Sequence, residues 1–162
     1  MKYEILKDEF IEFDGCKLYR IKALKDFHNV IEGEVGGYIE SERNLSHEGD
    51  AWVCGNARVS DSARVSGDAW VSGDARVCGD AWVLNRRSVV WFSNVGTENG
   101  TLTVYCGKNG LIATRGCFTG SVEEFLAKSS EVHDEKTKRE YELLIEVARS
   151  RLKEAQGNIW SE

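Results

Sequence analysis

Small and branched apolar residues return every six positions through the middle of the chain. Valine occupies one place in each repeat, alanine stands two residues before it, and an arginine or a tryptophan separates the two. The valines are Val53, Val59, Val65, Val71, Val77 and Val83, and the alanines are Ala51, Ala57, Ala63, Ala69, Ala75 and Ala81. A fixed short period predicts a solenoid, with alanine and valine pointing inward and the residue between them outward.

The outward residues predict three columns on the surface of the solenoid. Most repeats end in Gly-Asp or Gly-Asn, so four residues predict a strand and two a corner, and three repeats of six predict one triangular coil. Residues eighteen apart then lie above one another, and we expect Trp52 to stack on Trp70 and Arg64 to lie over Trp82. The first column is Glu34, Trp52, Trp70 and Ser88, the second is Glu40, Arg58 and Arg76, with an expected Glu40–Arg58 pair, and the third is Ser46, Arg64 and Trp82.

The N-terminal region predicts a cap for the solenoid. Two β-rich runs flank Asp14-Gly15, a pair that favours a two-residue hairpin turn, and we expect this hairpin to cover the first open edge. In the lead-in that follows, Val35, Ile39 and Leu45 fall near the six-residue register, so imperfect coils are expected to begin there. We assign residues 1–34 to the cap and residues 35–100 to the repeat region.

The C-terminal region predicts a second hairpin and two helices. Arg87 stands where a small inward residue is expected, so the coils should end there, and residues 101–120 predict a closing hairpin. Ser121 followed by Glu124 is a capping-box pattern for a short helix within residues 121–162. A longer helix is expected over residues 136–155, with an apolar stripe formed by Tyr141, Leu144, Ile145, Ala148 and Leu152.

Composition and charge argue against nucleic acid, metal ions and membranes as binding partners. The formal net charge of −6 argues against non-specific binding to DNA or RNA, which needs clustered Lys and Arg. Five cysteines form no pattern that suits zinc, so free thiols are expected and no metal site is predicted. No apolar run is long enough to span a bilayer and the first residues do not resemble a signal peptide, so we expect a cytoplasmic protein that binds no membrane.

The repeat over residues 51–83 resembles the hexapeptide-repeat left-handed β-helix family, and more loosely so does the stretch over residues 35–95. The resemblance implies a mainly β fold, with a short left-handed parallel β-helix in the form of a triangular prism, capped by β-hairpins and followed by α-helices. The order of LYRIKALKDF, GGYIESERNLSHEGDAWV, the repeats and GCFTGSVEEFLAKSSEVH is similar to that of small proteins of bacteriophages and prophages. That similarity implies a phage origin and transfers no catalytic residue.

The outward tryptophans and arginines are the candidate ligand or interface residues, because both types are enriched at interfaces and large exposed apolar groups mark them. They are Trp52, Arg58, Arg64, Trp70, Arg76 and Trp82. A neighbouring prism in a homotrimer, the terminal elements of the same chain, or a ligand could cover them. His47, at an inward position of the repeat, and His133, between the two helices, form a possible polar site.

Three functions fit these features. In the first, a non-enzymatic and oligomeric phage protein captures a host defence protein or a nucleotide-type signalling molecule in the host cytoplasm. In the second, it is a divergent hexapeptide-repeat acyltransferase with a site around His47 or His133. In the third, it is a structural or assembly protein of the phage. No recognisable catalytic pattern is present and no cofactor is predicted, which favours the first.

Overall fold

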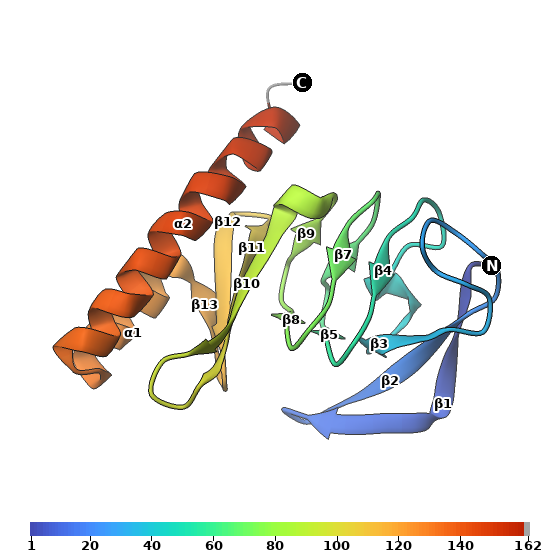
Figure 1. The fold of residues 1–162 in the computed structure, drawn as a ribbon, viewed down its shortest axis with the longest axis horizontal. Helices are drawn as coiled ribbons and strands as arrows, with labels where there is room; N and C mark the ends of the chain where they lie inside the picture. The colour runs from blue at the N-terminus through green and yellow to red at the C-terminus, as the bar shows by residue number, and fades with distance from the viewer. Residues whose placement is uncertain (161–162) are drawn as a thin grey trace.

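The middle of the protein is a stack of short parallel strands. The computed structural model describes the backbone of residues 1–160 and the side chains of residues 1–152. Six two-residue strands follow one another, and each of the first three pairs in parallel with the strand eighteen residues later, as Trp52 with Trp70 (Figure 1). They are β4 (Trp52–Val53), β5 (Arg58–Val59), β6 (Arg64–Val65), β7 (Trp70–Val71), β8 (Arg76–Val77) and β9 (Trp82–Val83). The predicted solenoid repeat is therefore confirmed.

The interior of the stack contains the alanines and valines of the repeat. All twelve are at most 1% exposed, which confirms the predicted inward rows. Burial of these side chains is the main favourable term for a coil that has only two paired residues per strand. Corner glycines make the turns: Gly67 has a φ of +63°, and a Cβ on it would lie 2.2 Å from the carbonyl oxygen of Leu84. A side chain at that corner is excluded by both backbone conformation and space.

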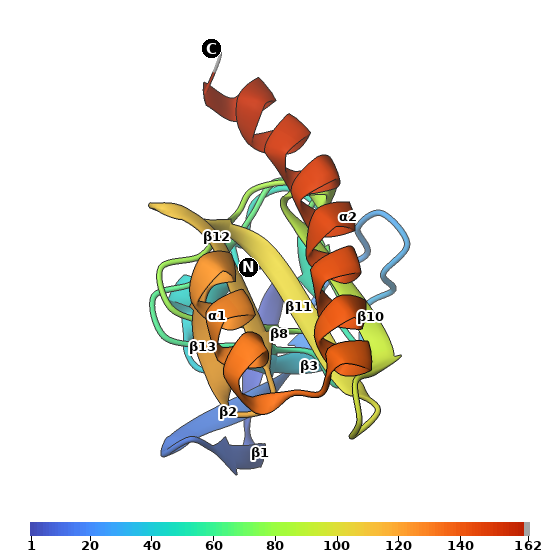
Figure 2. The same cartoon turned by 90° about the vertical axis from the view of Figure 1, so that its left-hand side faces the viewer.

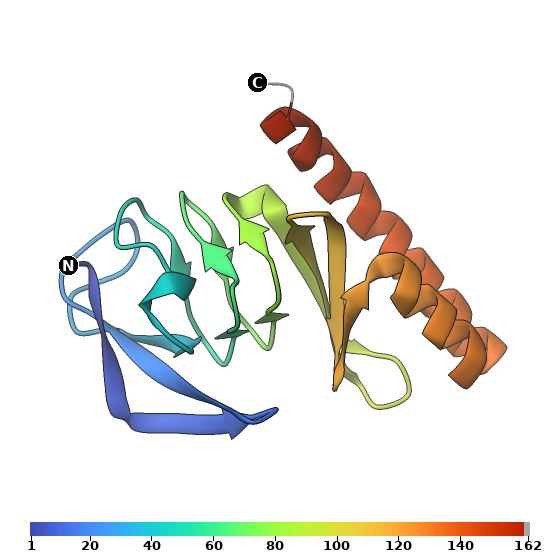
Figure 3. The same cartoon turned by 180° about the vertical axis from the view of Figure 1, so that it is seen from behind.

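The N-terminal hairpin extends one sheet of the solenoid. Strands β1 (Tyr3–Phe13) and β2 (Cys16–Ala23) pair in antiparallel fashion around Asp14-Gly15, both at positive φ, as predicted. Strand β2 pairs with β3 (Val35–Ile39), which pairs in parallel with β5, so the sheet order is β1-β2-β3-β5-β8. Figures 1 and 3 show the hairpin lying along one side of the coils.

The lead-in coil departs from the expected register. Ile39 pairs with Val59 and Leu45 with Val65, an offset of twenty residues, whereas Trp52 pairs with Trp70 at the regular eighteen. The two offsets differ because the lead-in coil has two extra residues between Leu45 and Trp52. These residues follow the 3-10 turn η1 (Glu42–Asn44). The expected placements of Glu40 over Arg58 and Ser46 over Arg64 are therefore wrong. Tyr38 is the register partner of Arg58, and Val35, half exposed, is not part of the core.

The other end of the solenoid is closed by a four-stranded antiparallel sheet. The coils end at the 3-10 turn η2 (Arg86–Ser88), where Arg87 is exposed and the small Ser88 is buried instead. Strands β10 (Val89–Val95), β11 (Gly100–Gly107), β12 (Gly110–Arg115) and β13 (Phe118–Ser121) follow in chain order. The predicted hairpin is the β11–β12 pair, and the two outer strands were not expected.

Two helices cover the outer face of this sheet. Helix α1 (Val122–Val132) begins at the predicted capping box, with reciprocal bonds between Ser121 and Glu124. Helix α2 (Glu135–Trp160) is longer than expected, and four of the five predicted stripe residues are buried against the sheet (Figure 2). Among residues 1–160, no helix combines the length and apolarity needed to cross a membrane.

Candidate functional site

The first column of outward residues is covered in part by the protein itself. Trp52 is only 1% exposed, because the rings of Phe27 and Tyr3 pack on it at centroid distances of 5.3 and 6.5 Å. Of the three possible coverings, the N-terminal elements of the same chain therefore cover Trp52. Trp70 is half buried, with the Arg86 guanidinium 5.4 Å from its ring centroid.

The second column holds the terminal elements against the solenoid. The guanidinium groups of Arg58 and Arg76 lie 4.8 and 5.1 Å from the ring centroid of Phe13, near the tip of the N-terminal hairpin. Arg76 also donates from Nη2 to the carbonyl oxygens of Gly116 and Phe118, at 2.7 and 2.8 Å, in the turn between β12 and β13. These contacts give both arginines a packing role in the monomer.

The third column lies in a groove. Arg64 and Trp82 are register partners in β6 and β9, Arg64 is exposed and Trp82 is partly exposed. They line a groove of about 560 Å³ that we call the Arg64–Trp82 groove, together with Arg43, Ser46, Val65, Ser66 and Leu84. The structure thus separates the six predicted residues and leaves two of them together on an accessible surface.

Local contacts fix the position of Arg43 at this groove. Its Nε donates to the carbonyl oxygen of Asp61 at 2.8 Å, one coil away, which bridges the two-residue insertion. Sequence reasoning missed Arg43, because the eighteen-residue register places Leu45 and its neighbours two positions away from where they lie. The signal was present: LSHEGDAW differs from the later VSGDAW by the added His47-Glu48.

The groove can attract an anion that carries a ring. Two guanidinium groups, an indole and two serine hydroxyls line it, and none of its described lining residues is acidic. Guanidinium groups bind carboxylate and phosphate with two parallel hydrogen bonds, and an indole stacks on flat rings. This surface is locally cationic in a protein whose net charge is −6.

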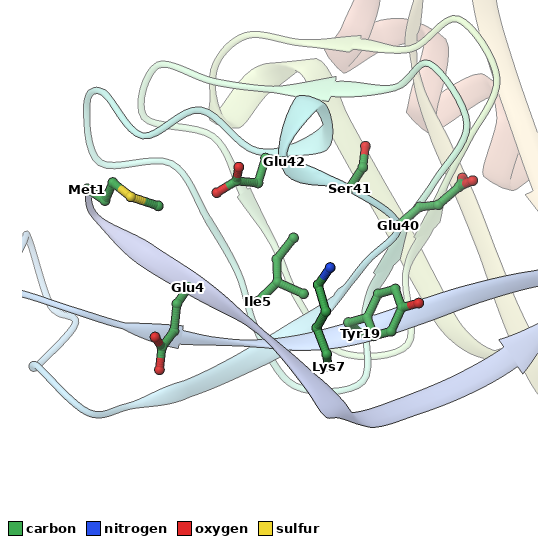
Figure 4. A pocket seen from close by; sticks show the side chains of 8 residues that line it. All are labelled: Met1, Glu4, Ile5, Lys7, Tyr19, Glu40, Ser41 and Glu42. Atoms are coloured by element: carbon green, nitrogen blue, oxygen red, sulfur yellow. The ribbon is translucent and has the colours of Figure 1, made fainter.

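A second cleft, shown in Figure 4, has the opposite character. It has a volume of about 410 Å³ between β1 and η1, and Glu4, Glu40 and Glu42 line it beside a single lysine, Lys7. Three carboxylates repel an anion, so this cleft does not suit the ligand class that fits the Arg64–Trp82 groove.

The two histidines lie outside that groove. His47, expected at an inward position, belongs to the insertion and stacks on Tyr3 at 4.1 Å. Its Nδ1 accepts from the Lys2 backbone N–H at 3.2 Å, and its Nε2 lies 3.2 Å from Glu42 Oε1. Both ring nitrogens therefore have partners within the N-terminal cap. His133 is at the other end of the molecule, where its Nδ1 lies 2.8 Å from Ser129 Oγ.

One trio of possible metal ligands was not anticipated. Single ligand atoms of Cys16, Glu40 and Asp61 lie within 4.8 Å of one another. Glu40 Oε1 accepts from the Asp61 N–H at 2.8 Å and Asp61 Oδ2 from the Gly79 N–H at 3.1 Å, so both carboxylates join neighbouring coils. The charge of Glu40, and then burial, raise the pKa of the Cys16 thiol. We assign the two carboxylates a structural role.

Parallel strands at a fixed interval, with one small and one branched residue buried in each, define the protein as a β-solenoid-repeat protein with C-terminal helices. The repeat matches the model of the YdcK beta solenoid repeat twice, over residues 51–67 and 63–79. These matches lie within the coils that form the Arg64–Trp82 groove and do not extend to the caps or the helices. Comparison with curated protein sequences gives no match.

Proposed function

We propose that this protein is a non-enzymatic binding module that captures a nucleotide-type ligand in the Arg64–Trp82 groove. The observation that supports this proposal is the gathering of Arg43, Arg64 and Trp82 on a surface with no acidic lining residue among those described. Phosphate oxygens would accept from the two guanidinium groups, and the base would stack on the indole.

The size and construction of the groove suit such a ligand. Its volume of about 560 Å³ falls within the usual range for small-molecule sites, roughly 300–1,000 Å³. Arg64 and Trp82 stand on paired strands whose neighbouring alanines and valines are packed in the core, so their backbones are held in place. Residues on rigid elements lose little conformational entropy on binding, which favours affinity.

The wider proposal follows the sequence resemblances. A bacteriophage protein with this groove would sequester a host signalling nucleotide in the cytoplasm and so counter a defence system. The closed, left-handed triangular prism and the homotrimer belong to the same proposal, and they rest on the hexapeptide pattern. In a trimer, the groove at the third column is the surface that a neighbouring subunit or a host defence protein would also use.

The acyltransferase alternative has less support. Such an enzyme needs a general base with a free ring nitrogen near an acyl-carrier site, and His47 has a partner at each nitrogen. Neither His47 nor His133 is among the residues that line the Arg64–Trp82 groove. The role as a phage assembly protein predicts no small-molecule ligand, so the experiment below also tests it.

Thermal unfolding with a panel of cyclic nucleotides and acetyl-coenzyme A tests the proposal. A ligand at 100 times its Kd stabilises the native state by about 2.7 kcal/mol, which raises Tm measurably. We expect a nucleotide to do so, and Arg64→Gln to weaken its binding by about tenfold through loss of a charge-assisted hydrogen bond. Arg58→Gln is the matched control, because Arg58 is covered by Phe13.

Two results would overturn the proposal. Stabilisation by acetyl-coenzyme A alone would favour the acyltransferase, and a nucleotide that bound Arg64→Gln as well as the parent would place its site elsewhere. Light scattering of Trp82→Ala separates capture from assembly, because a subunit contact at the groove requires the mass to fall. An unchanged mass would remove the groove from the trimer interface.

A further inference from the structure

A third cleft lies at the C-terminal end of the molecule, between helix α1 and the loops of the four-stranded sheet. It has a volume of about 350 Å³. Its polar lining includes Glu98, Arg115, Lys128, Ser129 and His133, and its aromatic lining comprises Phe118, Phe125 and Tyr141. We propose that this cleft, which we call the Arg115 cleft, binds a small organic carboxylate with an apolar body.

Arg115 is positioned to receive the carboxylate. Its Nε donates to the Tyr141 hydroxyl at 2.9 Å, which fixes the plane of the guanidinium. The side chain is only 14% exposed, and its Nη2 lies 3.8 Å from a carboxylate oxygen of Glu98, whose side chain is 81% exposed. A contact of that length with an exposed carboxylate is weak, so a ligand carboxylate can displace it.

Lys128 and His133 add polar groups from the end of α1. Lys128 is exposed, and its ammonium adds positive charge to the cleft. His133 Nδ1 is held by Ser129 Oγ at 2.8 Å, so Nε2 is the ring nitrogen that remains for a ligand. Glu98 is the one acidic residue among the described lining residues. The balance of charge therefore favours an anion.

The aromatic residues select the body of the ligand. Phe118 and Phe125 meet edge to face at a centroid distance of 5.5 Å, and Phe125 meets Tyr141 in the same way at 5.0 Å. Such rings offer an apolar wall next to the guanidinium, which suits an aromatic or branched acid better than inorganic phosphate. This cleft is separate from the Arg64–Trp82 groove and does not depend on the function proposed there.

Binding of benzoate, with inorganic phosphate as the comparison anion, tests the inference by calorimetry and by Tm. The parent protein should bind benzoate and show at least tenfold weaker binding of phosphate. Glu98→Gln should bind benzoate more tightly, by about three- to tenfold, because the competing carboxylate is removed. Lys128→Gln should weaken benzoate binding by a similar factor, and Lys136→Gln, on the exposed start of α2, should leave it unchanged.

Glu98→Gln keeps the test decisive, because Arg115 also contacts the body of the protein and its own variants risk misfolding. Absence of benzoate binding to the parent and to Glu98→Gln would overturn the proposal. It would also fail if Glu98→Gln and Lys128→Gln bound benzoate as the parent does, or if phosphate bound as well as benzoate. None of these outcomes bears on nucleotide binding at the Arg64–Trp82 groove, which Arg64→Gln reports.

Discussion

Raising the pH from 8 towards 10 should increase the contribution of one residue to stability, because this residue is a lysine buried in the N-terminal cap. Lys2 is 1% exposed, and its Nζ donates to the carbonyl oxygens of Ala51 at 2.6 Å and Gly49 at 3.3 Å. It also lies 4.9 Å from the ring centroid of Phe27. Burial lowers the pKa of Lys2 from 10.5 to about 8, and the nearby Asp50 charge opposes this only in part.

The sign and size of the effect follow from proton linkage. Between pH 8 and 10.5 the unfolded chain holds a proton on Lys2 that the folded chain has lost, so the contribution of Lys2 to the free energy of unfolding rises with pH. The difference between the two pKa values corresponds to about 3 kcal/mol in total. Burial, followed by the charge of Glu42, raises the pKa of Tyr3, so above about pH 10 ionisation of this tyrosine in the unfolded chain reverses the trend.

Urea unfolding followed by tryptophan fluorescence at pH 7.5, 8.5 and 9.5 measures this dependence. Lys2→Met is the control, since it keeps the length of the side chain and removes the titrating group. The difference in unfolding free energy between the parent and Lys2→Met should move in favour of the parent by at least 1 kcal/mol across this range. A constant difference would refute the inference that Lys2 is buried with a depressed pKa.

Three further predictions concern the coils and the thiols. Gly67→Ala should lower the free energy of unfolding in urea by about 3 kcal/mol or more, because its Cβ would clash with a carbonyl of the next coil. Gly79→Ala should lower it by about 1 kcal/mol, because the space around Gly79 is open. Asn44→Ala should cost about 2–4 kcal/mol in the same assay, because the buried Asn44 amide bonds backbone groups of two coils. The exposed Cys117 should be the first thiol to react with a disulfide reagent at pH 8. Cys106 is buried and its pKa is raised to about 11, so it should react only on unfolding. Mass spectrometry of the labelled protein measures both reactions.

The solenoid was predictable because its evidence is local and repeated. Every six residues carry the same inward alanine and valine, so a register error in one repeat would bury polar residues in all the others. The lead-in coil has no such redundancy. There the added His47-Glu48 shifts the register by two, and a strict eighteen-residue count placed Glu40 and Ser46 in the wrong columns.

The covering of the columns could not be predicted from the repeat. Trp52 is buried by Tyr3 and Phe27, and the Arg76 guanidinium is bound by backbone carbonyls of Gly116 and Phe118. These contacts join segments some 25 to 49 residues apart, and nothing in the spacing of tryptophans and arginines says which of them a cap will cover. The groove at the third column is lined by residues of the lead-in coil and the repeat.

The ends of the solenoid explain which outward columns the terminal elements contact. A stack of parallel strands ends in unpaired backbone groups, which must be covered or bonded. At the last coil, hydroxyls replace a strand: Thr103 Oγ1 accepts from the Arg76 N–H at 3.1 Å, Thr114 Oγ1 donates to the Arg76 carbonyl at 2.7 Å, and the buried Tyr105 hydroxyl bonds both backbone groups of Cys78.

At the first coil, the fully buried Tyr3 hydroxyl donates to the Leu45 carbonyl at 2.6 Å, so a tyrosine closes each end of the interior. The N-terminal cap brings Phe13 and Phe27 over the second and first columns, and the C-terminal sheet brings its β12–β13 turn to Arg76. Contacts with the terminal elements thus hold residues of the first and second columns. A substitution at the exposed Arg64 should therefore have little effect on the free energy of unfolding, whereas one at Arg76 should lower it.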